Sequence, residues 1–255
     1  MQETHLLTFP RTSNPLVSVL LPTRGRSEWL LKSIDSLLSL SYNPRNIEIL
    51  FKVDEDDEPT KVLAEKLCLG AVNSGLNIKS WVSPRGNGYQ EIHLWYNHLS
   101  SVATGDWLLV WNDDAVMLTE KWDYYLEFLT LDARFWHGAM DVCCLIPEMK
   151  DDPGCTAFFF LRRKVVEILG RYSAIPHCDT WVTKMMMAVD SLVHFPVIQV
   201  AHLQAHDKTF DEGQKGRETT EYTRHGHATN LERLQDSVKL QSYICEHGYL
   251  PKTAE

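Results

Sequence analysis

The segment from Asp106 to Ala115 constrains the fold most, because a short apolar run ends there in a cluster of acids. Its Leu, Val and Trp residues suit a strand that is covered on both faces, as in a parallel α/β sheet. Ligands of such sheets bind at the carboxyl ends of the strands, where Asn112, Asp113 and Asp114 would lie. Crowded carboxylates repel one another unless a cation joins them, and oxygen ligands suit Mg²⁺ or Mn²⁺ together with substrate phosphates. The pattern therefore predicts a metal–diphosphate site.

Strand-like and helix-like runs alternate through the first half of the chain. Apolar runs predict strands over 17–21, 47–53, 78–82 and 107–111. Helical spacing predicts a helix that follows Ser27, and further helices over 60–69 and 89–103. This alternation implies right-handed crossovers and a mostly parallel sheet.

The second half is less regular. Its residue pattern predicts strands over 141–146, 156–161 and 194–200. It also predicts helices over 122–131, 163–170, 179–188 and 229–247. The polar stretch 201–226 is expected to be a mobile loop. In the last predicted helix the residues expected to face inward are Leu231, Leu234, Val238 and Cys245.

Composition excludes several classes of protein. The net charge of −9 argues against a surface that coats nucleic acid. The six cysteines form no C-x-x-C pair, so reduced thiols are expected rather than a disulfide framework or a zinc ribbon. The first 14 residues lack the apolar core of a signal peptide, and no apolar run approaches the ~20 residues of a membrane span. We therefore expect a cytoplasmic protein with no transmembrane segment.

Four segments, taken in order, resemble the GT-A glycosyltransferases of the inverting family-two type. These are the run 17–26, the strand that ends at Asp54 and Asp56, the D-x-D-like stretch 105–114, and the run from 158 through Gly170 to Asp179. The resemblance spans about residues 15–210. It departs from the family pattern at Asn112, where Asp is more usual, and at His177-Cys178-Asp179, where the family has Glu-Asp.

The resemblance implies an α/β fold of the GT-A, Rossmann-like kind: a mostly parallel twisted sheet flanked by helices, with a C-terminal acceptor-side region. It implies one domain with two halves. The expected parts are a tail over 1–14, a nucleotide-sugar half over 15–118, an acceptor half over 119–210, and a loop with a C-terminal helix over 211–255.

The resemblance also implies a cofactor, Mn²⁺ or Mg²⁺, which neutralises the leaving diphosphate as a Lewis acid. Asp114 is the first choice for a direct metal ligand and Asp113 the second. His202, after the last predicted strand, would complete the metal ligands. A solvated turn at the acids and a surface histidine are the alternatives.

The nucleotide would contact residues that follow the predicted strands. Asp54 is expected to accept a hydrogen bond from the base, with help from Asp56. Thr23 is expected to lie near the base and the ribose, and Arg24 to pair with a phosphate. The full set expected to contact the donor is Pro22, Thr23, Arg24, Asp54, Asp56, Arg85, Asn112 and Asp113. A solvated charge run is the alternative for the acids after the second strand. An EF-hand loop there fails, because Pro59 occupies the position that requires Gly.

Asp179 is the candidate general base, since an acceptor hydroxyl must lose its proton to a group within hydrogen-bond reach. The alternative is an acid favoured by a helix N-terminus, and His177 is a second candidate. Trp181, next to Asp179 in sequence, is a candidate for stacking on an acceptor sugar. Asp207, Lys208 and Asp211 are expected to close over the diphosphate.

The sequence thus predicts a metal-dependent glycosyltransferase that moves a sugar, most simply from a UDP-sugar, to an unidentified acceptor hydroxyl with inversion. A retaining enzyme of the same fold stays an alternative, and three other classes of protein stay open. They are a non-catalytic sugar-nucleotide or glycan-binding protein, a nucleotidyltransferase, and a transferase that modifies nucleic acid. The turn from Pro22 to Arg26 is too short for the Gly- and Lys/Arg-rich loop of a nucleotidyltransferase.

Overall fold

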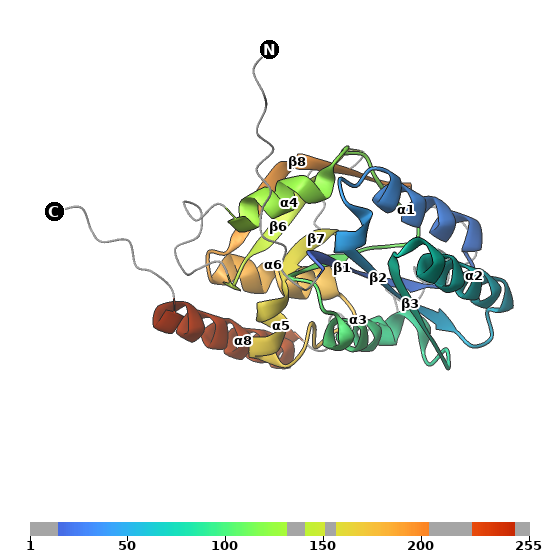
Figure 1. Ribbon diagram of the computed structural model, residues 1–255. Helices are drawn as coiled ribbons and strands as arrows, with labels where there is room; N and C mark the ends of the chain where they lie inside the picture. Colours follow the sequence, from blue (N-terminus) through green and yellow to red (C-terminus); the bar gives the residue numbers. More distant parts are fainter. Residues whose placement is uncertain (1–14, 132–140, 151–156, 204–225, 248–255) are drawn as a thin grey trace, which may run out of the picture.

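The described part of the chain forms an eight-stranded sheet in the order β3-β2-β1-β4-β7-β6-β8-β5, with helices on both faces (Figure 1). The computed structural model describes residues 15–131, 141–150, 157–203 and 226–247. The strands are β1 Val17–Thr23, β2 Ile47–Asp54, β3 Asn77–Ser83, β4 Trp107–Val110, β5 Ala115–Met117, β6 Cys144–Met149, β7 Phe159–Arg162 and β8 Leu192–His202. The helices are α1 Ser27–Ser39, α2 Glu58–Ser74, α3 Ile92–Val102, α4 Trp122–Leu131, α5 Arg163–Leu169, α6 Cys178–Ala188 and α8 Gly226–His247, with the 3-10 turns η1 Pro44–Asn46 and η2 Gly88–Glu91.

The first half of the sheet is parallel, as predicted. β1 pairs with β2 on one side and with β4 on the other, and β2 pairs with β3, all in parallel. Because parallel strands end at the same edge, the chain segments after β1, β2 and β4 meet there. This edge of the sheet carries the candidate site.

The second half of the sheet is mixed. β7 runs antiparallel to both β4 and β6, whereas β6 and β8 are parallel to each other. The short strand β5, which sequence periodicity did not predict, pairs antiparallel with β8. Its three residues are too few to show an alternation of their own.

Two apolar cores lie on the two faces of the sheet, because successive strand residues point to opposite sides. Val19 and Leu109 face the core that α1, α2 and α4 cover, while Leu20 and Leu108 face the core that α3, α5, α6 and α8 cover. The central strands are buried on both faces, which explains their nearly continuous apolar sequence.

Helix α8 buries a different face from the one expected. Leu231, Leu234 and Val238 are 58%, 59% and 56% exposed, so the prediction that they face inward was wrong. Cys245, expected to point inward with them, is exposed as well. The buried face instead carries Asp236, whose carboxylate accepts a 2.9 Å hydrogen bond from Arg171. A buried carboxylate needs such a partner, and the ion pair lies on the same helix face as the fully buried Leu240.

Several predicted boundaries shift by a few residues. The strand expected over 141–146 is observed at 144–149, and the helix expected over 89–103 begins with the 3-10 turn η2. Most of the loop expected over 201–226 lies outside the described residues. Within the described ranges, no helix combines the length and the apolar character that a bilayer crossing requires.

Candidate active site

The turn after β1 brings a threonine and two arginines to the carboxyl edge of the sheet. Gly25 adopts a φ of 67°, a left-handed conformation that glycine takes without strain. Its backbone N–H donates a 2.6 Å hydrogen bond to Asp57 Oδ2, which ties this turn to the start of α2. Arg26 then occupies the N-cap position of α1, and its side chain returns toward the sheet edge.

The acids after β4 lie directly against this turn. The Thr23 hydroxyl donates a 2.8 Å hydrogen bond to Asp113 Oδ2. One nitrogen of Arg26, Nη1, lies 3.1 Å from Asp113 Oδ1 and also 3.1 Å from Asp114 Oδ2. The side chains of Arg26, Asp113 and Asp114 are only 10%, 8% and 4% exposed. The structure therefore brings together the acids and the turn that the sequence assigned to one site.

Burial shifts the pKa of one of these acids. It raises the pKa of Asp113 to about 6, because a carboxylate removed from water is disfavoured in its charged form. The Arg26 guanidinium and the Thr23 hydroxyl oppose this rise, whereas the neighbouring Asp114 adds to it. Asp113 therefore takes up its proton at a higher pH than an exposed aspartate does.

Helix α1 holds the backbone of the same acidic loop. The Trp111 indole donates a 2.7 Å hydrogen bond to the Ser33 hydroxyl, which in turn donates to the Asn112 carbonyl at 3.2 Å. On the other face of the sheet, the buried Tyr96 hydroxyl lies 3.4 Å from Asn112 Oδ1. Ser33 thus holds the backbone of Asn112 from one face of the sheet, and Tyr96 orients its side chain from the other.

His202 reaches this site from the far part of the chain. The antiparallel pairing of β5 with β8 sets His202 opposite Ala115, one residue after Asp114. As a result, His202 Nε2 lies 3.1 Å from Asp114 Oδ1, and the Phe158 ring packs against the imidazole at a centroid distance of 5.2 Å. Asp114 and His202 therefore lie next to each other, as the sequence predicted.

The acids after β2 form a second ionic group at the same edge. Arg24 Nη1 donates to Asp54 Oδ2 at 2.9 Å, and Arg24 Nη2 donates to Asp56 Oδ2, also at 2.9 Å. The hydrogen bonds from Arg24 lower the pKa of Asp56, and the charge of Arg85 adds to that lowering. Arg85, from the turn after β3, is thus within electrostatic range of the group.

Sequence reasoning did not single out Lys52, which also belongs to this group. Lys52 Nζ donates to Asp54 Oδ1, and its ammonium lies 3.7 Å from the centre of the Trp95 ring. Lys52 and Asp54 are two residues apart on one strand and therefore share a face. The two-residue spacing between Lys52 and Asp54 in a predicted strand could therefore have indicated this ion pair from the sequence.

The candidate general base lies in the first turn of α6, as predicted, and its side chain is partly exposed. Burial raises the pKa of Tyr96 well above its ordinary value, and the charges of Asp113 and Asp179 both add to that rise. Tyr96 is thus within electrostatic range of the acidic loop and of Asp179. Nearby, the Tyr89 hydroxyl lies 3.4 Å from His177 Nδ1, which links η2 to the start of α6.

One predicted contact is wrong and others lie outside the described residues. Trp181 is fully buried in the core beneath α6, so it offers no face for stacking on an acceptor sugar. Its position follows from helical geometry, because its neighbours Val182, Met185 and Met186 on α6 are also buried. The residues expected to close over the diphosphate, Asp207, Lys208 and Asp211, lie outside the described ranges.

The chemistry of the donor atoms fits a divalent cation held jointly with a diphosphate. Among the described residues, no group of three His, Cys, Asp or Glu side chains is arranged as a metal cage. Asp114 and His202 nevertheless supply one carboxylate and one imidazole that already converge at 3.1 Å. Mg²⁺ and similar cations usually bind through one or two carboxylates, with substrate phosphates and water completing the shell.

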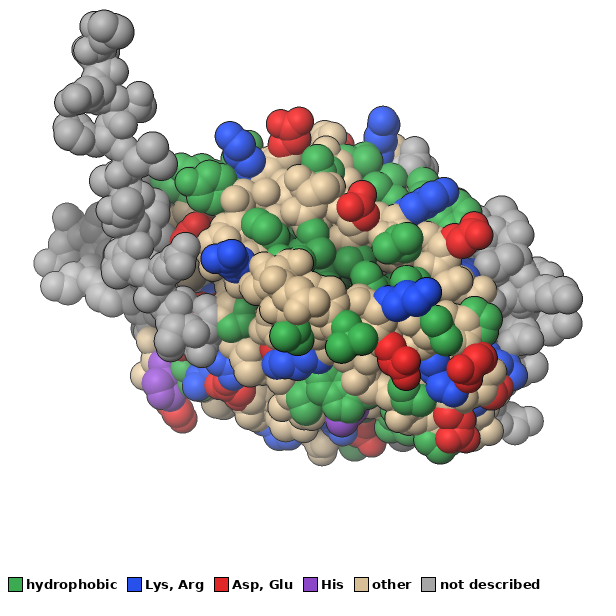
Figure 2. Space-filling model, turned by 45° about the vertical axis from the view of Figure 1, so that its right-hand side comes forward, with side chains coloured by type: hydrophobic (Ala, Val, Ile, Leu, Met, Phe, Trp, Pro, Cys, Tyr) green, Lys and Arg blue, Asp and Glu red, His purple; other side chains and the backbone are tan. Residues whose placement is uncertain are grey.

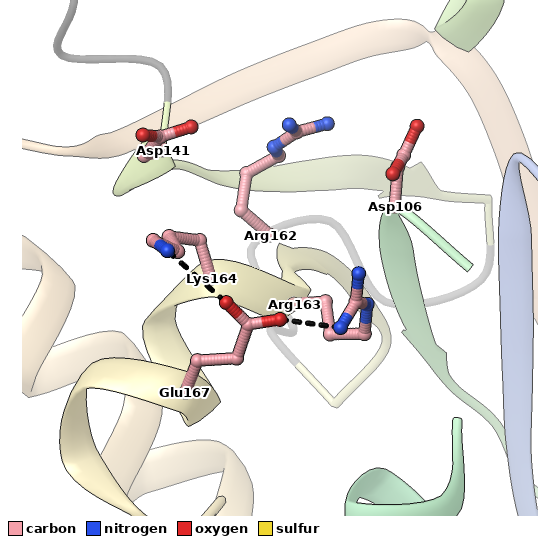
Figure 3. Close-up of a pocket in the computed structure, with 6 residues that line it drawn as sticks. All are labelled: Asp106, Asp141, Arg162, Arg163, Lys164 and Glu167. Carbon is pink, nitrogen blue, oxygen red and sulfur yellow. Dashed lines mark hydrogen bonds and ion pairs between the residues drawn. The ribbon is translucent and has the colours of Figure 1, made fainter. Parts of the chain in front are cut away.

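A cavity of about 160 Å³ lies at the opposite end of β4 (Figure 3). Asp106, which comes just before β4, lines it together with Arg162 and Lys164. Glu167 in its wall already pairs with Arg163 and with Lys164, and the Arg162 guanidinium lies 5.0 Å from the centre of the Trp107 ring. Because ligands of parallel sheets bind at the carboxyl ends of the strands, this cavity is distinct from the candidate active site.

The charges on the surface shown in Figure 2 do not favour binding to nucleic acid. On the face shown in Figure 2, Lys and Arg side chains of the described residues are interspersed with Asp and Glu. This mixture agrees with the net charge of −9. A basic band that could track a phosphate backbone does not form among the described residues of that face.

Comparison with known proteins agrees with this geometry. Residues 18–142 match the family model described as glycosyl transferase family 2, whereas no curated protein matches the chain significantly in sequence.

Solved structures match over nearly the whole chain. Mannosyltransferase PcManGT from Pyrobaculum calidifontis, in complex with GDP-Man and Mn²⁺, shares 13% identity over 94% of this chain and 78% of its own, with a TM-score of 0.58. S. aureus TarS 1–349 in complex with UDP shares 13% identity over 93% of this chain and 73% of its own, with a TM-score of 0.56. GalNAc-T7 with UDP, GalNAc and Mn²⁺ shares 14% identity over 93% of this chain and 55% of its own, with a TM-score of 0.53. The chain thus has the GT-A fold of these glycosyltransferases, and its residues 18–142 match glycosyl transferase family 2.

Proposed function

We propose that the protein is a glycosyltransferase that uses Mn²⁺ or Mg²⁺ to move a sugar from a nucleotide-sugar, most simply a UDP-sugar, to an acceptor hydroxyl with inversion. The observation that carries the proposal is the convergence of Thr23, Arg26 and His202 on Asp113 and Asp114. These residues come from three separate parts of the chain and meet at the edge where parallel sheets bind ligands. The solved structures with bound GDP-Man, UDP-GlcNAc or UDP support a nucleotide-sugar as the donor.

The donor diphosphate would lie against the acidic loop. Asp114 and His202 would hold the metal, with Asp113 as an additional ligand. When bound, the cation would supply Lewis-acid neutralisation of the leaving diphosphate. Asn112, oriented by Tyr96, would bond to a ribose hydroxyl, and Arg24 would offer its guanidinium to a phosphate.

The base of the nucleotide would be read by the group after β2. Asp54 is 7% exposed on its side chain and is held by Lys52 and Arg24. Hydrogen bonds from these two cations fix the orientation of the carboxylate. A carboxylate accepts hydrogen bonds, so Asp54 would bind an N–H of the base, such as the N3–H of uracil. Asp56, Arg85, Pro22 and Thr23 would complete the walls of this part of the site.

The acceptor would be activated on the side of α6. Asp179 would take the proton of the acceptor hydroxyl while that oxygen attacks the anomeric carbon. The bond between that carbon and the diphosphate oxygen breaks on the opposite face, so the configuration inverts. The partial exposure of Asp179 at the start of α6 supports this role, since an acceptor must be able to reach it.

The proposed organisation has two halves within one domain. Residues 15–118 would bind the nucleotide-sugar and residues 119–210 the acceptor, with 1–14 as a tail and 211–255 as a loop and C-terminal helix. The parallel part of the sheet supports the first assignment, because β1, β2 and β4 deliver the acids and arginines discussed above.

A second candidate is a protein that binds a nucleotide-sugar without transferring the sugar. Asn112 favours this alternative, because an amide at that position brings one negative charge fewer than the usual Asp. The release of free nucleoside diphosphate in the presence of Mn²⁺ separates the two candidates. An enzyme releases it on every turnover, whereas a binding protein does not.

The deciding experiment is a thermal-shift screen of UDP- and GDP-sugars with and without Mn²⁺. We expect one nucleotide-sugar to stabilise the wild-type protein only when metal is present, because a ligand that binds the folded state raises its melting temperature. Asp114→Asn should abolish that effect, while Asp35→Asn, at an exposed position on α1, should leave it intact. An equal response to every nucleotide, or no response, would contradict the proposal.

A further inference from the structure

Arg26 is placed where an incoming divalent cation would have to compete with it. A single nitrogen of its guanidinium is shared between the carboxylates of Asp113 and Asp114, at 3.1 Å from each. All three side chains are at most 10% exposed, so water screens their charges only weakly. The protein's own cation therefore already joins the two acids.

The fold fixes this arrangement. Gly25 turns the chain with a φ of 67°, and the hydrogen bond from its N–H to Asp57 anchors the turn. Arg26 follows as the N-cap of α1, so its backbone is held by the start of that helix. The Thr23 hydroxyl holds Asp113 from the other side of the turn. Arg26 is thus delivered to the acids by an anchored backbone.

We propose that Arg26 is a built-in counter-ion that makes metal binding depend on the donor diphosphate. Without a nucleotide, the guanidinium holds Asp113 and Asp114 together and repels a divalent cation. When a nucleoside diphosphate arrives, its anionic oxygens offer the guanidinium a new partner, and a guanidinium binds such oxygens through paired hydrogen bonds. The two carboxylates then become available to the metal, so cation and diphosphate bind together.

The inference rests on the proposed function, because it assumes that the Asp113–Asp114 pair receives a metal with a nucleoside diphosphate. It adds an order to the binding events and gives a role to a residue outside the predicted set of nucleotide contacts and metal ligands. Arg26 would contact the donor diphosphate and set the affinity for the metal, and it would take no part in the proton transfer from the acceptor.

The test measures Mn²⁺ binding directly, from the electron paramagnetic resonance signal of free Mn²⁺, on the full chain with and without UDP or GDP. The wild-type protein should bind Mn²⁺ weakly alone and much more tightly with one of the two nucleotides. Arg26→Gln should bind Mn²⁺ alone roughly tenfold more tightly than the wild type, because a neighbouring positive charge is removed. It should also lose most of the gain that the nucleotide brings.

Two further variants control this result. Arg26→Lys keeps the charge and should stay close to the wild type in its affinity for Mn²⁺ alone. Arg163→Gln removes an arginine that pairs with Glu167 at the other end of β4, and it should leave Mn²⁺ binding unchanged. Thermal unfolding of each variant establishes that it is folded.

The outcomes separate the inference from the proposed function. If the wild type binds neither nucleotide in the presence of Mn²⁺, the proposed function fails. If it binds one of them but Arg26→Gln binds Mn²⁺ alone no more tightly than the wild type, the inference alone is overturned. Wild-type protein that binds Mn²⁺ equally well with and without nucleotide also overturns the inference, whether or not the variants fold.

Discussion

Thr23 and Asp113 are 90 positions apart in the chain, yet the threonine hydroxyl donates a 2.8 Å hydrogen bond to the aspartate carboxylate. The register of the sheet explains this contact. β1 and β4 run in parallel with Leu20 opposite Val110, and Thr23 and Asp113 each come three residues later. Because the two strands are adjacent, parallel and in register, Thr23 and Asp113 lie side by side at the edge of the sheet.

The Thr23–Asp113 hydrogen bond should contribute to stability. Thr23→Val keeps the shape of the side chain but leaves a buried carboxylate without one of its donors. We expect a loss of about 1–3 kcal/mol in the free energy of unfolding, measured by urea denaturation at pH 7.5. Thr23→Ser retains the hydroxyl and should lose clearly less. Equal losses in both variants would show that packing of the methyl group, and not the hydrogen bond, is what matters.

The titration of Asp113 should make the stability depend on pH. Burial raises the pKa of this carboxyl to about 6 from an ordinary 3.8. Between these values the folded protein holds a proton that the unfolded chain has lost. Stability from this group is thus complete below about pH 4 and is lost as the pH rises through about 6.

The measurement compares the wild type with Asp113→Asn in the absence of metal. The difference between their unfolding free energies should change by roughly 2–3 kcal/mol between pH 4 and pH 7.5, with the wild type becoming relatively less stable as the pH rises. If the two proteins have the same dependence on pH, the carboxyl does not titrate in this window.

Gly105 should not tolerate a side chain. A Cβ atom at this position would lie 2.5 Å from the Ser18 backbone nitrogen and 2.7 Å from the Val17 carbonyl carbon. Both are backbone atoms of the central strand β1, so neither can move cheaply. We expect Gly105→Ala to destabilise the protein by about 1–3 kcal/mol.

Gly70 provides the matched control for that substitution. It lies inside α2, and a Cβ there meets nothing within 4 Å. Gly70→Ala should therefore stabilise the protein by about 0.5–1 kcal/mol, because alanine favours the helix more than glycine does. Thermal or chemical denaturation measures the stability of both variants. If both substitutions stabilise the protein, or both destabilise it by the same amount, the contact argument is contradicted.

Asp179→Asn should separate donor binding from catalysis. If this carboxylate accepts the acceptor proton, its loss should reduce kcat by about 10²–10⁴-fold. The affinity for the nucleotide-sugar with Mn²⁺, measured by calorimetry, should stay near that of the wild type.

Asp190→Asn, at the other end of α6, is the control for that variant. Asp190 is exposed and has a φ of 52°, a conformation that asparagine tolerates, so activity should be unchanged. Asp179→Asn with full activity would remove this residue as the base. A parallel loss of donor binding would instead assign Asp179 to the donor site.

Much of the parallel half could be predicted because each signal there is local. Runs such as 47–53 and 107–111 are apolar, long enough for buried strands, and end in acids. The order of strands and helices then implied which ends meet. The prediction was weaker where burial depends on distant partners. Trp181 and the Leu231 side of α8 were both assigned to the wrong environment, because neither a core position nor an exposed helix face is set by residue type alone.

The amino-acid sequence by itself determined the α/β alternation, the acids at the strand ends and the match of residues 18–142 to family 2, since these depend on short-range spacing. Only the tertiary structure decided which charges neutralise which. Arg26 joins Asp113 and Asp114, Lys52 shares Asp54 with Arg24, and His202 meets Asp114 across 88 positions. Such pairs follow from strand register and burial, which act between residues that are close in space but distant along the chain.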